Sequence, residues 1–344
     1  MTTSWAVQIQ AHFCLSLHAA KGFVLDGSRS RELIPRSDRV LVAGVSRSGT
    51  SWLGQALGSL PSAKYCYEPD IINAAVEKRE ASGSREFAPY PEIEASENGG
   101  PHRALWNMVF AGGLPLQEDG HLDRRAFRVI APLRKLPPPV LNSMVKFGSR
   151  VLTAAAKKPD LLIVKSVFSQ FCMEWLLEQY SPTVVLIQRG PLNVVSSWRA
   201  LHIPLFDLLT RPSIVKKSRD WYDGLVPSAE DPEIMRLAWA VGMLTSAMGE
   251  SLDMHPDWML VTHDDLIKQP VESLKQIVAS LGLDWSDEVA NYLERSNRHG
   301  SGITPERITS EQGDRWKGRL SPEETEQVEL VLSRFQRKGW IRPN

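Results

Sequence analysis

Residues 40–52 of this 344-residue chain read Val-Leu-Val-Ala-Gly-Val-Ser-Arg-Ser-Gly-Thr-Ser-Trp. The first four are apolar, as in a short strand that is buried on both faces of a sheet. Gly44 and Gly49 bound a polar loop, and a helical pattern begins after it. A strand, a glycine-containing loop and a helix in this order point backbone N–H groups and the positive helix end at an anion. We therefore expect an anion site where this loop leads into the helix.

The loop has the glycine spacing of a phosphate-binding P-loop, but its cation is displaced. Thr50 stands where the P-loop lysine should be, and a threonine cannot supply that charge to β- and γ-phosphates. The positive charge lies three residues earlier, at Arg47. The pattern predicts a ligand whose 5′-phosphoryl group carries one more small anionic group, rather than a triphosphate. The alternative, a glycine turn with a solvated arginine, gives no reason for the flanking strand and helix.

Four further short apolar runs are typical of buried parallel strands. Together with the first they span Val40–Ala43, Lys64–Tyr67, Leu161–Val164, Val184–Ile187 and Trp258–Val261. Helical patterns lie between them, the clearest from Pro232 to Met254. This alternation predicts an α/β fold like that of P-loop NTPases, a doubly wound sheet of about five parallel strands flanked by helices. In such a sheet, ligands bind at the carboxyl ends of the strands.

Composition sets the broad class of the protein. The 40 basic and 40 acidic side chains cancel, which argues against a nucleic-acid coat or a membrane-surface protein. Any anion site must therefore be made locally, by a few placed cations. Three cysteines without CxxC spacing fit a reducing compartment, and no apolar run of 18 residues is present. We expect a cytoplasmic protein without a membrane span or a nucleic-acid partner.

We expect one domain over residues 1–344, with three segments set apart by their composition. Residues 1–36 form an N-terminal extension without the pattern of a secretory signal, and alternation from Val7 to Leu17 favours a strand, although a helix stays open. Residues 78–103 are rich in Glu, Ser, Gly and Pro, and residues 203–231 mix aromatic and basic side chains. Long loops of this kind are functional lids or variable insertions, and we expect these two to bind an acceptor.

Residues 46–52 resemble the 5′-phosphosulfate loop of sulfotransferases, which use 3′-phosphoadenosine 5′-phosphosulfate (PAPS). The resemblance implies that Arg47 contacts the transferring sulfuryl group and the bridging oxygen, and that Trp52 stacks on adenine. It also implies a 5′-phosphate site made by Ser48, Gly49, Thr50 and Ser51.

A second motif resembles the 3′-phosphate signature of the same family. Residues 184–191 read Val-Val-Leu-Ile-Gln-Arg-Gly-Pro, and a serine follows eight residues after the arginine. The resemblance implies that Arg189 and Ser197 clamp the 3′-phosphate, for which the planar fork of an arginine is well suited. Gly190 departs from the family, which usually has Asp or His there. Both motifs, in the order that the family has, are stronger evidence for the resemblance than either motif alone.

Fainter resemblances cover most of the remaining chain. Lys165 ends a strand where the family has a lysine near the 5′-phosphate, and residues 313–317 (Gly-Asp-Arg-Trp-Lys) resemble the final cofactor loop. The Arg-Lys-Gly of cytosolic enzymes is missing there. Arg307, Thr309 and Lys317 are the candidates for the remaining 3′-phosphate contact.

The general base is expected to be Glu68. Cytosolic members place a histidine where this chain has Val167, whereas Tyr65-Cys66-Tyr67-Glu68-Pro69 resembles the aromatic-x-aromatic-Glu-Pro of carbohydrate and tyrosylprotein enzymes. Partial burial can bring a glutamate into the range of a general base. A glutamate that is merely ion-paired is the alternative, and His102 and His202 are reserve candidates. With no metal-ligand pattern among the eight histidines, we expect a reaction without metal.

These patterns favour a PAPS-dependent sulfotransferase, with Arg47, Glu68 and Lys165 as catalytic residues. It would transfer the sulfuryl group to a hydroxyl, or less readily an amine, of a small molecule, lipid or glycan, and release adenosine 3′,5′-bisphosphate. Two alternatives stay open at this point. One is a P-loop kinase that uses ATP and Mg²⁺, with Asp264 as the metal ligand, and the other is a binding protein with a degenerate nucleotide site. The acceptor and the oligomeric state are not predicted.

Overall fold

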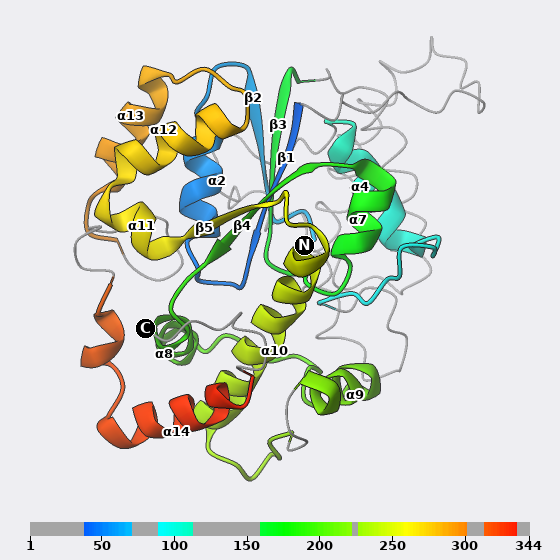
Figure 1. The fold of residues 1–344 in the computed structure, drawn as a ribbon, viewed down its shortest axis with the longest axis vertical. Helices are drawn as coiled ribbons and strands as arrows, with labels where there is room; N and C mark the ends of the chain where they lie inside the picture. Colours follow the sequence, from blue (N-terminus) through cyan, green and yellow to red (C-terminus); the bar gives the residue numbers. More distant parts are fainter. Residues whose placement is uncertain (1–37, 71–88, 113–158, 222–225, 301–312, 336–344) are drawn as a thin grey trace, which may run out of the picture. The chain divides into compact units, whose positions relative to one another are not determined.

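The computed structural model describes residues 38–70, 89–112, 159–221, 226–300 and 313–335 (Figure 1). The chain divides into two compact units, residues 1–32 and 33–344, and all described residues belong to the second. The expectations for residues 1–36, and for parts of 78–103 and 203–231, therefore lie outside the described residues.

A five-stranded parallel sheet forms the centre of the described unit, as the sequence predicts. Its strands are β1 (Arg39–Gly44), β2 (Ala63–Tyr67), β3 (Leu161–Ser166), β4 (Thr183–Gln188) and β5 (Met259–Thr262). Their order is β2-β3-β1-β4-β5, so the first strand lies in the middle. All six residues of β1 are buried, which explains its continuous apolar run. The strand expected from Trp258 begins one residue later, because the Trp258 N–H is used in a turn with the His255 carbonyl oxygen.

Helices cover both faces of the sheet (Figure 1). One face carries α2 (Thr50–Gly58), α11 (His263–Lys268), α12 (Pro270–Ser280) and α13 (Asp287–Ser296). The other carries α4 (Gly100–Phe110), α7 (Met173–Tyr180), α8 (Pro191–Leu201), α10 (Glu233–Met254) and α14 (Pro322–Ser333). Alternate residues of β1 serve the two cores, Val40 and Val42 toward α2, and Leu41 and Ala43 toward α8 and α10. The doubly wound fold class is thereby confirmed.

Two segments differ from the loops that were expected. Helix α9 (Pro212–Trp221) lies within residues 203–231, and α4 begins inside 78–103. Each helix has a proline at its start, Pro212 or Pro101, where the missing N–H costs no hydrogen bond. The short 3₁₀ helix η3 (Arg315–Gly318) precedes α14, which begins with a capping box of Ser321 and Glu324. Among the helices of the described ranges, none has the length and apolar character needed to cross a membrane.

Candidate active site

The sheet register brings the loops after β1, β3 and β4 to one edge. Ala43 is opposite Ser166, and Gly44 is opposite Ile187, so the three strands end at nearly the same level. The chain continues from β1 to α2 on one face of the sheet and from the neighbouring β4 to α8 on the other face. This is the topological switch point at which ligands bind in open α/β sheets.

The loop between β1 and α2 presents free backbone N–H groups. Gly49, the N-cap of α2, has φ 97°, a left-handed conformation that favours glycine. No side chain of the described residues caps this helix start, and the first turn holds no acidic residue. The N–H groups at the start of α2 are therefore available to an anionic ligand.

Side chains from the loops after β3 and β4 and from α8 hold this loop through hydrogen bonds to its carbonyl oxygens. The Gln170 amide donates to the Gly44 oxygen at 3.0 Å, and the Trp198 indole donates to the Ser46 oxygen at 2.9 Å. The Arg189 guanidinium donates to the Arg47 oxygen at 3.1 Å. With these carbonyl oxygens held, the loop keeps one conformation before a ligand arrives. No sequence pattern indicated Gln170, because its partner is 126 residues away.

The structure brings Arg47, Arg189 and Ser197 together, as the two motifs require. Besides the contact between the arginines, Nε of Arg47 donates to Oγ of Ser197 at 3.2 Å. Arg47 itself has φ 76°, which an arginine rarely adopts and which turns its side chain within the loop. Ser48 and Arg189 also line one pocket together. The loops that were predicted to bind the 5′ and 3′ ends of one nucleotide are therefore in contact.

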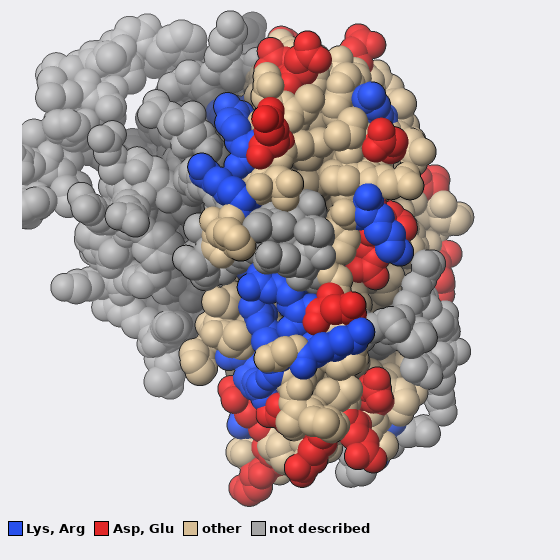
Figure 2. Space-filling model, turned by 90° about the vertical axis from the view of Figure 1, so that its left-hand side faces the viewer, with Lys and Arg blue, Asp and Glu red and all other residues tan. Residues whose placement is uncertain are grey.

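Positive charge is concentrated around Arg189. Burial lowers the pKa of Arg189 to about 9, with a further contribution from Arg47 and smaller ones from Arg315 and Arg319. Figure 2 shows Lys and Arg gathered at the level of α8 and η3 on the face that lies to the left in Figure 1. Because the guanidinium groups weaken one another's charged state, a bound anion would relieve their repulsion. Arg315 and Arg319 were not predicted as site residues, although Arg315 lies in the 313–317 motif.

Glu68 and Lys165, both predicted as catalytic, form a buried ion pair. Nζ of Lys165 is the donor and Oε1 of Glu68 the acceptor, and the two residues are 1% and 8% exposed. The same nitrogen lies 4.4 Å from the centre of the Tyr67 ring. Glu68 has φ 40°, so this residue too is held in a left-handed conformation. Burial and the nearby Arg47 lower the pKa of Lys165 well below its usual range, so its charge depends on the Glu68 carboxylate.

A second carboxyl group, which the sequence did not suggest, lies beside this pair. Oγ of Ser166 donates to Oδ2 of Asp70 at 2.5 Å, and Asp70 is 1% exposed. Burial raises the pKa of Asp70 to about 7, against the hydrogen bond from Ser166, which lowers it. Its other oxygen, Oδ1, has no hydrogen-bond partner among the described residues. The edge of β3 therefore carries two buried carboxyl groups, of which only Glu68 has a cationic partner in the described part of the chain.

The other predicted residues are spread around this centre. The Trp52 indole donates to Oγ of Ser296 at 3.0 Å, and its ring centre is 6.5 Å from that of Tyr292. Lys317 is largely exposed and pairs with Asp314 at 3.0 Å. Its segment is tied to α8, since the Asn193 amide donates to the Gly313 oxygen at 2.7 Å. Arg307 and Thr309 lie outside the described residues.

The reserve histidines are poorly placed to act as a base. His102 is buried in α4, and burial lowers its pKa to about 4. His202 is exposed and ends α8 as its C-cap. His263, which was not predicted, packs against the loop after β1: a Cβ atom on Gly49 would lie 2.9 Å from its ring. In the part of the chain that is described, no three His, Cys, Asp or Glu side chains form a group suited to a metal ion.

Comparison with known proteins gives similarity only at the level of solved structures. No protein-family model and no curated protein sequence matches the chain. It is similar to the sulfotransferase domain from the curacin biosynthetic pathway, with a TM-score of 0.45 and 15% identity over 86% of this chain and 97% of that one. Mouse sulfotransferase SULT7A1, complexed with PAP, has a TM-score of 0.43 and 12% identity over 90% and 88% of the two chains. Sulfotransferase STF1 from Mycobacterium tuberculosis has a TM-score of 0.40 and 14% identity, over 94% of this chain and 81% of that one.

Proposed function

We propose that this protein is a sulfotransferase that takes a sulfuryl group from PAPS and transfers it to a hydroxyl group, releasing adenosine 3′,5′-bisphosphate. The contact between the two arginine-bearing loops carries the proposal. A donor with phosphate groups at both ends of its ribose needs two anion sites a few ångströms apart, and the loops after β1 and β4 supply them side by side.

The donor is held by its charges. The N–H groups at the start of α2 bind the 5′-phosphate, and Arg189 with Ser197 binds the 3′-phosphate. Arg47 then lies at the sulfuryl group, where its fixed positive charge stabilises the transition state. The chain has no net charge and does not attract anions as a whole, so binding of the donor depends on this local cluster of cations.

The chemical step needs a base near the sulfur. The acceptor oxygen forms a bond to sulfur while the bond from sulfur to the bridging oxygen breaks, and the acceptor proton moves to Glu68. The electron pair of the broken bond stays on the 5′-phosphate of the product. Lys165 supports this step in two ways: its ion pair holds the Glu68 carboxylate in place, and its ammonium group lies near the leaving group.

The surroundings of Asp264 favour a kinase less than a sulfotransferase. A P-loop kinase would need this carboxylate to hold Mg²⁺ at the phosphates. Asp264 follows β5, and its neighbour His263 packs against Gly49 of the first loop. Asp264 is half exposed, and its pKa is lowered by the His263 ring, whose Nδ1 lies 3.9 Å from Oδ1 of Asp264, and, to a smaller extent, by Arg189. It therefore faces a cation of the protein itself. Thr50 still lacks the charge that a triphosphate requires.

Thermal shift measurements separate these two activities. Adenosine 3′,5′-bisphosphate without Mg²⁺ should raise the midpoint of unfolding, because a ligand at 100 times its Kd adds about 2.7 kcal/mol. ATP with Mg²⁺ should have little effect. Transfer of ³⁵S from labelled PAPS to a mixed pool of hydroxyl compounds then tests the activity itself. A shift with ATP and Mg²⁺ alone would favour a kinase, and a bisphosphate shift without any transfer would favour a binding protein.

A further inference from the structure

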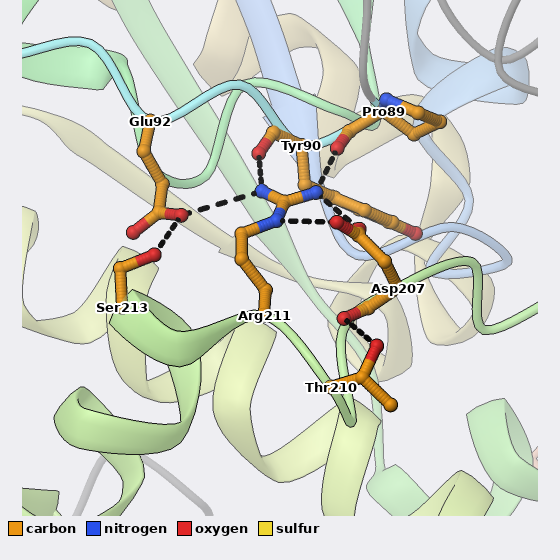
Figure 3. A network of polar contacts seen from close by, with 7 residues as sticks. All are labelled: Pro89, Tyr90, Glu92, Asp207, Thr210, Arg211 and Ser213. Carbon is orange, nitrogen blue, oxygen red and sulfur yellow. Dashed lines mark hydrogen bonds and ion pairs between the residues drawn. The ribbon is translucent and has the colours of Figure 1, made fainter. Parts of the chain in front are cut away.

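Arg211, in the segment between α8 and α9, joins two segments through every nitrogen of its guanidinium group (Figure 3). Nε and one terminal nitrogen contact the Asp207 carboxylate, with Nε at 3.0 Å. The same terminal nitrogen donates to the Pro89 oxygen at 2.9 Å. The other donates to the Tyr90 oxygen at 2.6 Å and lies 3.5 Å from Glu92. Arg211 is only 3% exposed, so the planar fork is fully used inside the protein.

The residues that Arg211 holds have an unusual backbone. Tyr90 has φ 56°, and Phe206, next to Asp207, has φ 52°. A left-handed conformation at a non-glycine residue costs of the order of 1 to 3 kcal/mol and persists only where the surroundings enforce it. Such residues cluster at active sites and ligand clamps. Arg47 and Glu68, at the candidate active site, share this conformation.

Both strained residues are aromatic, and their rings meet at the end of β3. The ring centres of Tyr90 and Phe168 are 5.1 Å apart, and Phe206 lies 6.2 Å from each of them, all edge-on. Phe168 is only three residues after Lys165, and its N–H donates to Oγ of Ser166 at 3.2 Å. Phe206 is only partly buried. The cluster therefore adjoins the Glu68–Lys165 pair and keeps part of one ring at the surface.

We propose that Arg211 is a positioning residue that fixes Tyr90 and Phe206 against Phe168, and that this aromatic cluster is the wall of the acceptor site. The inference rests on the proposed function and adds the class of acceptor to it. Tyr90 and Phe168 are 1% and 8% exposed, so they support the partly exposed Phe206 ring from behind. That ring offers apolar surface but no charge for a polar ligand. The acceptor is accordingly a hydroxyl carried by an apolar body, rather than a sugar.

The test uses the full chain with PAPS and three acceptors: 2-naphthol, 1-octanol and N-acetylglucosamine. The wild-type protein should transfer sulfate to 2-naphthol or 1-octanol with a kcat/KM at least about tenfold above that for the sugar. Arg211→Lys retains the charge but has only three donors at one point, so it cannot hold both segments. It should raise KM for the preferred alcohol about tenfold and change kcat little, because it loosens acceptor binding and leaves the reacting groups in place.

Two further variants and a control complete the design. Phe206→Gly removes a ring, tolerates φ 52°, and should raise KM in the same way even if Arg211→Lys does not fold. Arg211→Met combined with Asp207→Asn removes the pair without leaving a single buried charge. Thr210→Ala, in the same loop, removes only a contact between Oγ1 and the Asp207 backbone oxygen, and should leave KM unchanged.

The thermal shift with adenosine 3′,5′-bisphosphate keeps the two proposals apart. If the variants retain the wild-type shift while KM for the alcohol rises, the inference holds. An unchanged KM, or a loss of the bisphosphate shift together with the rise in KM, would overturn the positioning role. Preference for the sugar, or no transfer to either alcohol, would overturn the acceptor class. A wild-type protein that shows no bisphosphate shift would instead overturn the proposed function.

Discussion

At the scale of single residues, the pairing of Glu68 with Lys165 has two interpretations. A buried ion pair is costly to break from one side, so it could serve only to hold β2 and β3 together. The pair uses Oε1 of Glu68, however, and it lies beside Arg47, whose positive charge adds to the lowering of the Lys165 pKa. A carboxylate held beside Arg47, at the expected sulfuryl site, fits a base better than a purely structural contact.

Glu68→Gln distinguishes these interpretations. The amide keeps the shape of the side chain and can still accept from Lys165, but it cannot take a proton. We expect kcat to fall by about a hundredfold or more, as on loss of a general base, with little change in the affinity for adenosine 3′,5′-bisphosphate. Steady-state rates and titration calorimetry check the two parts. A variant that is less stable but has the wild-type kcat would leave Glu68 as a structural residue.

The raised pKa of Asp70 predicts how the stability of the protein changes with pH. Its folded pKa of about 7 lies above the ordinary value of 3.8, so the folded protein binds this proton more tightly than the unfolded chain. The resulting stabilisation is complete below pH 3.8 and is lost as the pH rises through 7. Asp70→Asn lacks this contribution. Relative to the wild type, it should gain about 2 to 3 kcal/mol in unfolding free energy between pH 5 and pH 8.

Urea unfolding of both proteins at the two pH values measures this difference. Other titrating groups contribute equally to wild type and variant, so they cancel in the comparison. The same free-energy difference at pH 5 and pH 8 would mean that Asp70 is already ionised in the folded protein near pH 5.

At the scale of elements, the junction of the first loop with α2 depends on a glycine. A side chain at Gly49 would meet two obstacles, the left-handed φ of 97° and the His263 ring 2.9 Å away. Gly282 has φ 71°, and no described atom lies within 4 Å of the place that a methyl group would take there, so Gly282→Ala is a matched control for backbone strain alone. Each alanine should cost about 1 to 2 kcal/mol of stability from the backbone.

Only Gly49→Ala should weaken binding of adenosine 3′,5′-bisphosphate, by about tenfold or more, because it displaces the N–H groups at the start of α2. Adding His263→Ala removes the steric contact and should restore part of that affinity. Calorimetric titration of the three variants provides the comparison. Equal affinity for adenosine 3′,5′-bisphosphate in Gly49→Ala and Gly282→Ala would mean that the first loop does not form the phosphate site.

The elements themselves could be predicted where a local pattern specifies them. The five strands were found because each is a short, largely apolar run. The strands β1 and β3 are buried along their whole length, and β2 and β5, at the edges of the sheet, are partly buried. Helix α10 was found because its apolar stripe is long. Helices α4 and α9 were missed. The glycines and proline at 99–101 suggest a turn before α4, and α9 is a short helix within a segment of mixed composition. Helix α7 begins at Met173, after a turn in which the Cys172 N–H donates to the Ser169 carbonyl oxygen.

At the scale of the whole molecule, the site could be predicted only as far as its motifs reach. Arg47, Arg189 and Ser197 stand in sequence patterns, and the structure brings them into contact. Gln170 and the Arg211 network stand in no such pattern. They act through hydrogen bonds to backbone oxygens more than 100 residues away, and such bonds require a carbonyl oxygen that any residue can supply. These contacts could therefore not be predicted from the local sequence.

The joining of two distant loops on one nucleotide is a property of the whole molecule. Titration calorimetry with adenosine 5′-monophosphate and adenosine 3′,5′-bisphosphate tests it, since the ligands differ only in the 3′-phosphate. Trp198→Phe is the control, because it also removes a hydrogen bond to the first loop but takes away no phosphate-binding group. Trp198→Phe should weaken the binding of both ligands by the same factor.

In the wild type the bisphosphate should bind more tightly, by about a hundredfold, as expected for a buried phosphate held by an arginine fork. In Arg189→Ala that preference should nearly vanish, while binding of the monophosphate should weaken no more than in Trp198→Phe, because each variant removes one hydrogen bond to the first loop. A preference that survives in Arg189→Ala would contradict the account, because the loop after β4 would then not hold the second phosphate.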